Sequence, residues 1–340
     1  MALSPFGLDI GRSFIKVVQI EKKGDRKILL GAGAVVTPGG GVQSESAVDL
    51  GKISDSIKNC LEVAKIDISR CVVSLTESQV ISRLIELPPL TDKELSAAIH
   101  WEAEQYIPLP IKDVSLQYQV VNRPQDPSAG KMEVLLVAVP KRMIEKYLTM
   151  VKNAGLSVEA IETESQALVR ALTKNDDPPT IIVSMGAVST ELVVANRGNI
   201  LFTRSIASGG FNLTKAIMAE FNLPQKQAEE YKQTYGIVED KLSGKVAAVL
   251  KPILDIIITE MLKAGEFSRG RTGDLAISRV VICGGGAFLP GLGQFLVERT
   301  SLEVSLGDPW SGFAKEGFLL GPLASSGSLY AVATGLALRS

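Results

Sequence analysis

The chain is poor in the side chains that most often hold zinc. Among its 340 residues there is one histidine, His100, and the three cysteines Cys60, Cys71 and Cys283 lack C-x-x-C spacing. Zinc sites usually take four such ligands from closely spaced pairs. We therefore expect no zinc centre, and we assign no role to His100. Unpaired thiols are typical of a reducing cytoplasm.

Long apolar runs and blocks of like charge are missing as well. The most apolar helical segment, 246–262, is interrupted by Lys251, Pro252, Asp255 and Glu260, so it falls short of the roughly 20 apolar residues that span a bilayer. The 36 Lys and Arg residues balance 37 Asp and Glu residues, which gives no reason to expect nucleic acid or anionic lipid as a partner. The N-terminus also lacks the pattern of a signal peptide. We expect membrane contact to be indirect.

What the chain does have is enough apolar material for more than one core. Apolar residues make up 46% of the sequence, and the chain exceeds the roughly 250–300 residues at which single cores stop growing. Two segments, 7–20 and 180–196, share one pattern of apolar strand, glycine-containing turn and apolar strand. Each predicts a β-hairpin with a polar tip, so the chain looks internally duplicated.

Two further glycine turns follow the hairpins. Gly209 and Gly210 precede a polar, helical region that extends to about residue 270. The turn Gly284-Gly285-Gly286 follows the apolar run 280–282 and precedes a predicted helix that begins near Phe288. Strand, glycine turn and helix in succession are typical of sites that bind phosphate or nucleoside groups.

A region with its own pattern lies between the hairpins. Thr91 and Glu94 predict a capping box for a helix that ends before Pro108. Strands are predicted at 115–121 and 133–139, and a further helix at 141–154. These elements predict a small α+β subdomain over residues 80–158.

The order of the two hairpins and the two glycine turns resembles the actin, Hsp70 and sugar kinase superfamily. The resemblance implies an α/β, actin-like fold of two duplicated, ribonuclease H-like domains that bind ATP and Mg²⁺ between them. Asp9 would hold the magnesium ion through water, and Lys16 would offer a point charge to the phosphates. The implied nucleotide-binding residues are Asp9, Gly11, Arg12, Ser13 and Lys16 in the first hairpin, Gly186, Ala187, Val188, Ser189 and Thr190 in the second, and Gly210, Glu229, Lys232, Gly284, Gly285 and Gly286 beyond it.

Simpler interpretations apply to some of these residues. Asp9 and Gly11 alone would suit an ordinary turn, and only the order of the four motifs favours a nucleotide site. Glu229 and Lys232, three apart on a predicted helix, would contact ribose and adenine within the superfamily, but a surface salt bridge explains them equally well.

One residue departs from the superfamily pattern. The second hairpin normally begins with an Asp that positions metal and attacking water, and this chain has Ser184 there. A hydroxyl supplies no charge and does not act as a base. We expect ATP to bind and hydrolysis to be weak or absent. We also find no Asp that could replace it as a catalytic base.

The segment 101–111, WEAEQYIPLPI, is similar to the characteristic helix and loop of the PilM family of type IV pilus assembly proteins, which resembles the cell-division protein FtsA. The resemblance implies an FtsA-type small subdomain inserted in the first domain. It implies four units: 1–79 with 159–180 and 325–340 (1A), 80–158 (1C), 181–207 with 271–324 (2A), and 208–270 (2B).

The family resemblance also implies a partner. It predicts a scaffold in the cytoplasm that is recruited to the inner membrane by the N-terminal peptide of a PilN-like protein, with other platform proteins and the assembly motor as further candidates. The peptide would dock between the first domain and the small subdomain. The residues expected to line its groove are Leu84, Leu87, Trp101, Tyr106 and Ile107, for which core packing is the simpler alternative.

Two other functions share this fold. An FtsA-like, filament-forming ATPase would self-associate, although the C-terminal residues 330–340 predict a packed helix rather than an amphipathic anchor. A small-molecule kinase would need a carboxylate base at the cleft. Sedimentation with ATP separates the first function from a scaffold, and turnover of a small substrate separates the second.

Overall fold

Two five-stranded sheets of the same design form the body of the protein, in a computed structural model that describes residues 4–339 except 25, 40, 125, 127–129, 270–275 and 315–322. The first sheet has the order β3-β2-β1-β4-β8, and the second has the order β11-β10-β9-β12-β13. In each sheet three antiparallel strands are followed by two parallel ones. The duplication predicted from the two hairpins is therefore present.

The strands of the two sheets have the following bounds. The first sheet contains β1 (Phe6–Ile10), β2 (Phe14–Lys23), β3 (Arg26–Val36), β4 (Arg70–Leu75) and β8 (Ser157–Thr163). The second contains β9 (Thr180–Met185), β10 (Thr190–Asn196), β11 (Asn199–Ile206), β12 (Arg279–Cys283) and β13 (Glu303–Leu306).

The two hairpins match at the level of single hydrogen bonds. The amide of Gly11 donates to the carbonyl of Phe14 over 3.0 Å, and the amide of Gly186 donates to the carbonyl of Ser189 over 2.9 Å. Each bond closes the turn that follows the first strand of its sheet. The duplicated sequence pattern therefore specifies duplicated turns.

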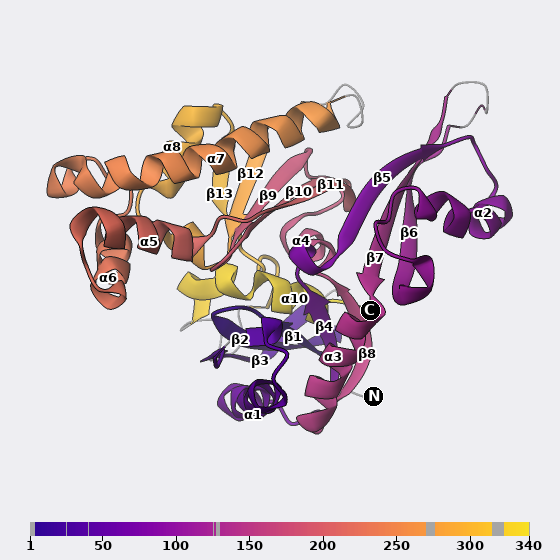
Figure 1. Cartoon of the computed structure of the whole chain (residues 1–340), viewed down its shortest axis with the longest axis horizontal. Helices are drawn as coiled ribbons and strands as arrows, with labels where there is room; N and C mark the ends of the chain where they lie inside the picture. Colours follow the sequence, from indigo (N-terminus) through magenta and orange to yellow (C-terminus); the bar gives the residue numbers. More distant parts are fainter. Residues whose placement is uncertain are drawn as a thin grey trace.

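Two helices, α4 (Glu164–Leu172) and α10 (Ala331–Ala337), fill the space between the sheets (Figure 1). Apolar residues of both sheets pack against them, among them Val72, Ile182 and Val193. The contact is close because glycines face backbone atoms: a Cβ at Gly335 would lie 1.9 Å from the carbonyl oxygen of Ala167. This buried layer joins the two sheets.

Other helices cover the outer faces of the sheets. Helices α1 (Ala47–Ala64) and α3 (Lys141–Asn153) share a core with the first sheet. Helices α5 (Gly210–Phe221), α6 (Gln225–Tyr235), α7 (Lys245–Ser268) and α8 (Leu292–Thr300) share one with the second. Short 3₁₀ helices are η1 (Gly41–Gln43), η2 (Glu77–Gln79), η3 (Ile111–Asp113), η5 (Lys241–Gly244), η6 (Gly285–Phe288) and η7 (Ala324–Tyr330).

A small antiparallel sheet stands to one side of this body (Figure 1). It contains β5 (Ile81–Leu87), β6 (Val114–Asn122) and β7 (Met132–Pro140) in the order β5-β7-β6, and α2 (Asp92–Glu104) packs on one of its faces. The predicted capping box of α2 is confirmed: the Glu94 amide donates to the Thr91 hydroxyl, and the Thr91 amide donates to the Glu94 carboxylate.

The division into four units stays a prediction, and one helix suggests a different limit. Tyr147, Met150 and Val151 of α3 are buried in the core of the first sheet, and β8 pairs with β4. The packing of α3 therefore favours a small unit that ends near Pro140 rather than at 158. Residues 1–3, 25, 40, 125, 127–129, 270–275, 315–322 and 340 of the predicted units lie outside the described residues.

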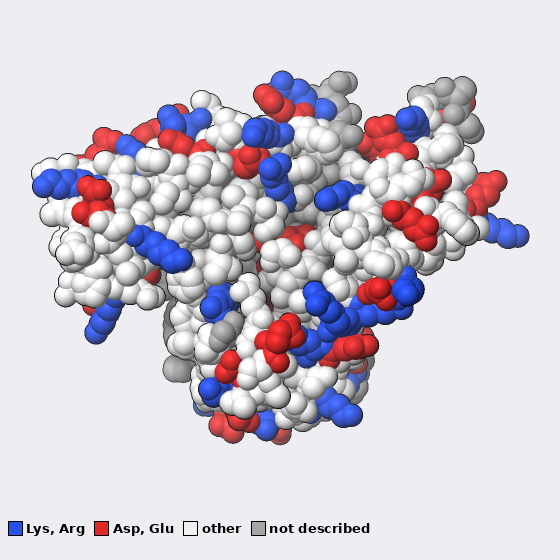
Figure 2. Space-filling view, viewed as in Figure 1, with Lys and Arg blue, Asp and Glu red and all other residues white. Residues whose placement is uncertain are grey.

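The surface agrees with the balanced composition. Figure 2 shows Lys and Arg side chains interspersed with Asp and Glu side chains over the visible face. Within the described residues, no helix is both long and apolar enough to cross a bilayer.

Candidate functional site

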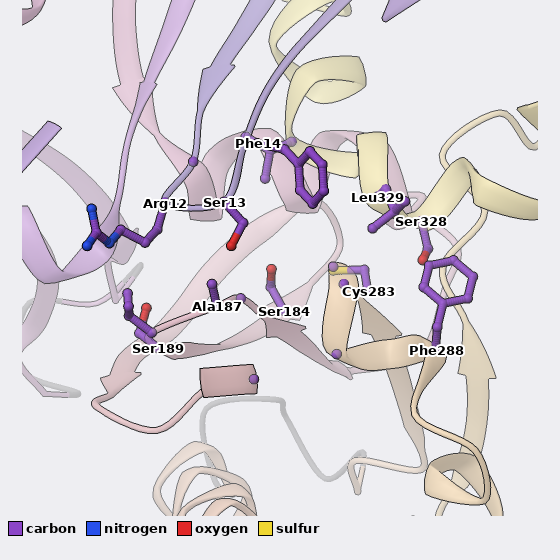
Figure 3. Close-up of a pocket in the computed structure, with 18 of the residues that line it drawn as sticks. Arg12, Ser13, Phe14, Ser184, Ala187, Ser189, Cys283, Phe288, Ser328 and Leu329 are labelled. Carbon is purple, nitrogen blue, oxygen red and sulfur yellow. The ribbon is translucent and has the colours of Figure 1, made fainter. Parts of the chain in front are cut away.

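A cavity of about 720 Å³ lies where the two hairpins approach each other. Its size suits a small-molecule or cofactor site. Every predicted nucleotide residue except Thr190 lines it: Asp9, Gly11, Arg12, Ser13, Lys16, Gly186, Ala187, Val188, Ser189, Gly210, Glu229, Lys232, Gly284, Gly285 and Gly286. Figure 3 shows Arg12 and Ser13 on the side opposite Ala187 and Ser189.

In the first hairpin, Asp9 and Lys16 face each other across β1 and β2. The Lys16 Nζ lies 2.5 Å from the Asp9 Oδ2, and the Ser74 hydroxyl lies 3.5 Å from the other oxygen. Burial alone would lower the pKa of Lys16, but the charge and hydrogen bond of Asp9 leave that pKa raised. A lysine that stays charged inside a cavity suits the binding of an anion.

In the second hairpin, the carbonyls of Gly186 and Ala187 are used by the protein itself. The Gly210 amide donates to the Gly186 carbonyl over 2.9 Å, and the Phe211 amide donates to the Ala187 carbonyl over 2.8 Å. These bonds cap the first turn of α5, whose amides have no partners within the helix. A Cβ at Gly209 would lie 2.7 Å from the Gly186 carbonyl oxygen. Gly209 is therefore needed to seat α5 on the hairpin, whereas a Cβ at Gly210 would make only ordinary contacts, the nearest 3.5 Å from the Lys232 Nζ.

Thr190, which the sequence assigned to the phosphates, does not line the cavity. It is fully buried, and its hydroxyl donates to the Ser208 carbonyl over 2.7 Å. In this structure its side chain therefore fixes the chain between β11 and α5.

The last glycine turn forms the far wall of the cavity. Gly284 has a φ of 79°, and a Cβ there would lie 2.6 Å from the Met185 carbonyl oxygen, so a larger residue would push the turn away from β9. Phe288 at the end of η6 is 42% exposed, and Phe14 of the first hairpin is 46% exposed. Both line the cavity together with Leu329 (Figure 3). These side chains give the cavity an apolar part that suits a flat ring.

Glu229 and Lys232 line the cavity but bind mainly each other. The Lys232 Nζ lies 2.7 Å from the Glu229 Oε2 and donates to the Thr214 hydroxyl and the Gly210 carbonyl. Burial would raise the pKa of Glu229, but the hydrogen bonds from Lys232 and Thr214 leave it lowered. All three Lys232 donors are thus engaged. Their first role is to tie α6 to α5.

Two carboxylates in the cavity were missed from the sequence. Glu164 begins α4 and Glu191 lies in β10, and both line the cavity. Burial, then the Asp9 and Glu191 charges, raise the pKa of Glu164 well above its ordinary value. Burial raises the pKa of Glu191 to about 7. A signal for Glu191 existed, because a hairpin that pairs Met185 with Thr190 also pairs Ser184 with Glu191.

The magnesium ion that the resemblance implies can be tested against these groups. Within the described residues, no group of three His, Cys, Asp or Glu side chains could hold a metal ion. Mg²⁺, however, usually keeps several waters and takes few protein ligands beside phosphate oxygens. Asp9 is buried at the cavity wall, and one oxygen of Glu191 is buried without a hydrogen-bond partner. The cavity therefore fits a hydrated ion bound with a nucleotide.

A second cavity, of about 600 Å³, lies beside the small sheet. It is lined by Gln119 of β6, by Glu162 and Arg170 at β8 and α4, and by Arg339. Arg170 forms two hydrogen bonds to the Glu162 carboxylate, of 2.6 and 3.0 Å, and Arg339 forms one of 2.8 Å. Two guanidinium groups thus share one carboxylate, which leaves an excess of positive charge.

The residues predicted to line a peptide groove are not brought together. Leu87 and Ile107 are buried in the core beneath α2, while Leu84 packs on the opposite face of the small sheet, against the α4 layer. Trp101 is 76% exposed, and Tyr106 is also exposed. The core interpretation thus applies to Leu87 and Ile107.

The comparisons with known proteins show what this chain is similar to in sequence and in fold. A family model described as type IV pilus assembly protein PilM matches residues 7–340. The solved PilM-PilN type IV pilus biogenesis complex is similar over 99% of this chain and 98% of that chain, with a TM-score of 0.83 and 28% identity. MreB 5 of Spiroplasma citri bound to AMPPNP is similar over 98% and 95%, with a TM-score of 0.53 and 15% identity. The cell division protein FtsA of Streptococcus pneumoniae is 23% identical over 347 residues, which cover 88% of this chain and 74% of FtsA. The expected actin-like α/β fold with two ribonuclease H-like domains is confirmed.

Proposed function

Because this chain belongs to the PilM family of type IV pilus assembly proteins, related to FtsA within the actin-like superfamily, we propose that it is an ATP-binding scaffold. In this proposal, ATP binds between the two sheets, and the N-terminal peptide of a PilN-like membrane protein binds beside the small sheet. The observation that carries it is the cavity between the duplicated hairpins, which is lined both by the Asp9–Lys16 pair and by the apolar side chains of Phe14, Phe288 and Leu329.

The proposed nucleotide pose follows from the chemistry of the walls. Lys16 of β2 is a half-buried cation that lines the cavity, so it binds phosphate oxygens when they displace it from Asp9. Asp9 then holds water of the magnesium ion. Phe14 and Phe288 flank the apolar part, which receives the base. MreB, whose structure was solved with AMPPNP and with ADP, has the same fold and supports adenine nucleotide as the ligand.

We propose that turnover is slow. Magnesium, when bound, would shield the phosphate charge. A charged group where β9 meets the cavity would be needed to orient an attacking water, and this chain has Ser184 there. ATP occupancy, rather than rapid hydrolysis, would then set the state of the scaffold.

We propose the second cavity as the docking place of the peptide. It is bordered by Gln119 of the small sheet and by Glu162 and Arg170 of the first domain, as the family resemblance requires. Strand β6 is an edge strand of its sheet and β8 is an edge strand of the first sheet. Such edges accept an extended peptide through backbone hydrogen bonds. The similarity to a PilM-PilN complex supports a PilN-like partner.

The partner would also determine location. A chain recruited by the cytoplasmic peptide of an inner-membrane protein would lie in the cytoplasm at that membrane, without touching lipid itself. Further platform proteins and the assembly motor would bind surfaces that stay free, and self-association would be compatible with this arrangement.

Calorimetry tests the proposal directly. The protein is titrated with Mg·ATP and, separately, with a synthetic N-terminal peptide of the neighbouring PilN-like protein, while phosphate release is followed. We expect binding of both and little phosphate release. If neither Mg·ATP nor the peptide binds, the proposed scaffold function is rejected. Rapid phosphate release would reject the role given to Ser184.

A further inference from the structure

A row of four side chains crosses the second sheet at the cavity. Strand register places Cys283 beside Ser184, Ser184 opposite Glu191, and Glu191 opposite Ser205. Side chains at directly paired positions lie on the same face of a sheet. Ser184, Glu191 and Cys283 all line the cavity. The charge that is missing at Ser184 is therefore present one strand away.

The Glu191 carboxylate is held in a fixed orientation. Its Oε1 accepts hydrogen bonds from the hydroxyls of Ser189, over 2.9 Å, and Ser205, over 2.8 Å. Glu191 is only 3% exposed, and its Oε2 is buried and has no hydrogen-bond partner. A buried carboxylate oxygen without a partner costs free energy. A ligand in the cavity that donates to Oε2 would remove that cost.

The surroundings of Glu191 favour a cationic ligand. The acidic residues Asp9 and Glu164 also line the cavity, and Lys16 is the cation paired with Asp9. Glu77 of η2 adds a further carboxylate that acts on Glu191, and burial together with these neighbours raises the pKa of both Glu164 and Glu191. Carboxylates outnumber ammonium groups around this point, so a divalent cation would relieve their repulsion.

We propose that Glu191 holds a water molecule of the hydrated divalent cation that binds with the nucleotide, through Oε2, and so supplies to the cation, though not to an attacking water, the charge that Ser184 lacks. The contact is through water, because Mg²⁺ that binds with phosphate groups usually keeps several of its waters. The inference rests on the proposed binding of ATP, and it adds the residue on which the metal dependence of that binding relies.

The test measures the affinity for AMP-PNP by calorimetry, once in EDTA and once in Mg²⁺. Four proteins are compared: the unmodified chain, Glu191→Gln, the swap Ser184→Asp with Glu191→Ser, and Glu303→Gln. Glu303 is an exposed carboxylate of β13 in the same sheet and serves as the matched control. Titration of Mn²⁺ into each AMP-PNP complex, followed by electron paramagnetic resonance, measures cation affinity separately.

We expect Mg²⁺ to tighten AMP-PNP binding about tenfold or more in the unmodified chain and in Glu303→Gln, as hydrogen bonds to a charged group allow. In Glu191→Gln the affinity in EDTA is kept or improved, and the tightening by Mg²⁺ is largely lost. The swapped variant regains it, because the charge returns to the same face of the sheet. Mn²⁺ affinity follows the same order.

The opposite results separate two failures. If Glu191→Gln keeps the full effect of Mg²⁺ and binds Mn²⁺ as the unmodified chain does, the role of Glu191 is rejected while ATP binding stands. If the unmodified chain binds no AMP-PNP in either condition, the proposed function and this inference both fall. Retained AMP-PNP binding in EDTA shows that a variant is folded at the site.

Discussion

Asp9 and Lys16 form a buried ion pair, with 2.5 Å between the carboxylate Oδ2 and the ammonium Nζ, at paired positions of β1 and β2. Removal of one partner from such a pair leaves a buried charge and costs more than the pair itself contributes. The pair therefore links the stability of the first hairpin to its ability to bind an anion.

Asp9→Ala should lower the free energy of unfolding by about 3–5 kcal/mol, as expected when a buried ion pair is broken, and should abolish the effect of Mg²⁺ on ATP binding. The double variant Asp9→Ala with Lys16→Met should recover most of the stability, because no unpaired charge remains. It should not recover ATP binding. Denaturant unfolding and calorimetry check the two parts, and a double variant that binds ATP would remove the pair from the site.

Glu191→Gln should make the protein more stable at alkaline pH. The Glu191 pKa is about 7 in the fold against an ordinary value of 4.5, so the folded state binds the proton more tightly than the unfolded state does. The stability that this group contributes is complete below about pH 4.5 and is lost as the pH rises through about 7.

Glutamine removes that loss. Relative to the unmodified chain, Glu191→Gln should gain up to about 3 kcal/mol above pH 8 and little at pH 4. Glu77 and Glu164 face the same region and titrate in both proteins. Because the Glu191 charge also raises the pKa of Glu164, the difference between the two proteins reports Glu191 together with its effect on Glu164. Urea unfolding in EDTA at a series of pH values measures it, and a gain that does not depend on pH would contradict the assignment.

Gly335→Ala should destabilise the layer between the sheets, although alanine is the better helix former. A Cβ at this position of α10 would lie 1.9 Å from the Ala167 carbonyl oxygen of α4, so the helices must separate. We expect a loss of about 1–3 kcal/mol. Gly293→Ala in α8 is the matched control, since a Cβ there meets nothing within 4 Å, and it should be neutral or stabilising in thermal unfolding. Equal effects would show that α10 tolerates displacement.

Gln119→Trp should weaken binding of the PilN-like peptide at least about tenfold, because the indole would fill the second cavity. Trp101→Ala should leave it unchanged, since Trp101 is exposed on α2, apart from the second cavity. Fluorescence anisotropy with a labelled peptide distinguishes the two surfaces. If Trp101→Ala weakens peptide binding and Gln119→Trp does not, the peptide binds on the outer face of α2 instead of in the second cavity.

The sequence predicted the parts of the fold that depend on local pattern. Hairpins, glycine turns and the Thr91 cap appear where short-range chemistry requires them. The face of a helix was harder to predict. In α2 the buried residues are Leu95, Ile99 and Ala103, whereas Trp101 lies on the exposed side of the helix. From the sequence alone, a large aromatic residue such as Trp101 suggests a buried position, because its exposure to water is costly.

The sequence predicted the hairpins and glycine turns that line the site, but it did not predict the buried carboxylates of Glu164 and Glu191. Glu164 and Glu191 belong to no short motif, and only pairing across strands and packing across the two sheets bring them to one cavity. Thr190 was predicted to bind phosphates because the residues before it were. Side chains alternate between the two faces along β10, however, and the Thr190 side chain points toward Ser208. The register of the second hairpin, which pairs Met185 with Thr190, would have placed Glu191 beside Ser184 and Thr190 on the other face of β10.

Helix α4 lies between the two cavities and contributes to both. Glu164 and Leu168 line the first cavity, while Gln166 and Arg170 line the second. A nine-residue helix is too short to bend between them, so movement of one face carries the other with it. A ligand that shifts α4 in one cavity therefore changes the binding free energy in the other, and linkage makes that effect equal in both directions. Under the proposed function, ATP bound in the first cavity and a peptide bound in the second would each change the affinity of the protein for the other.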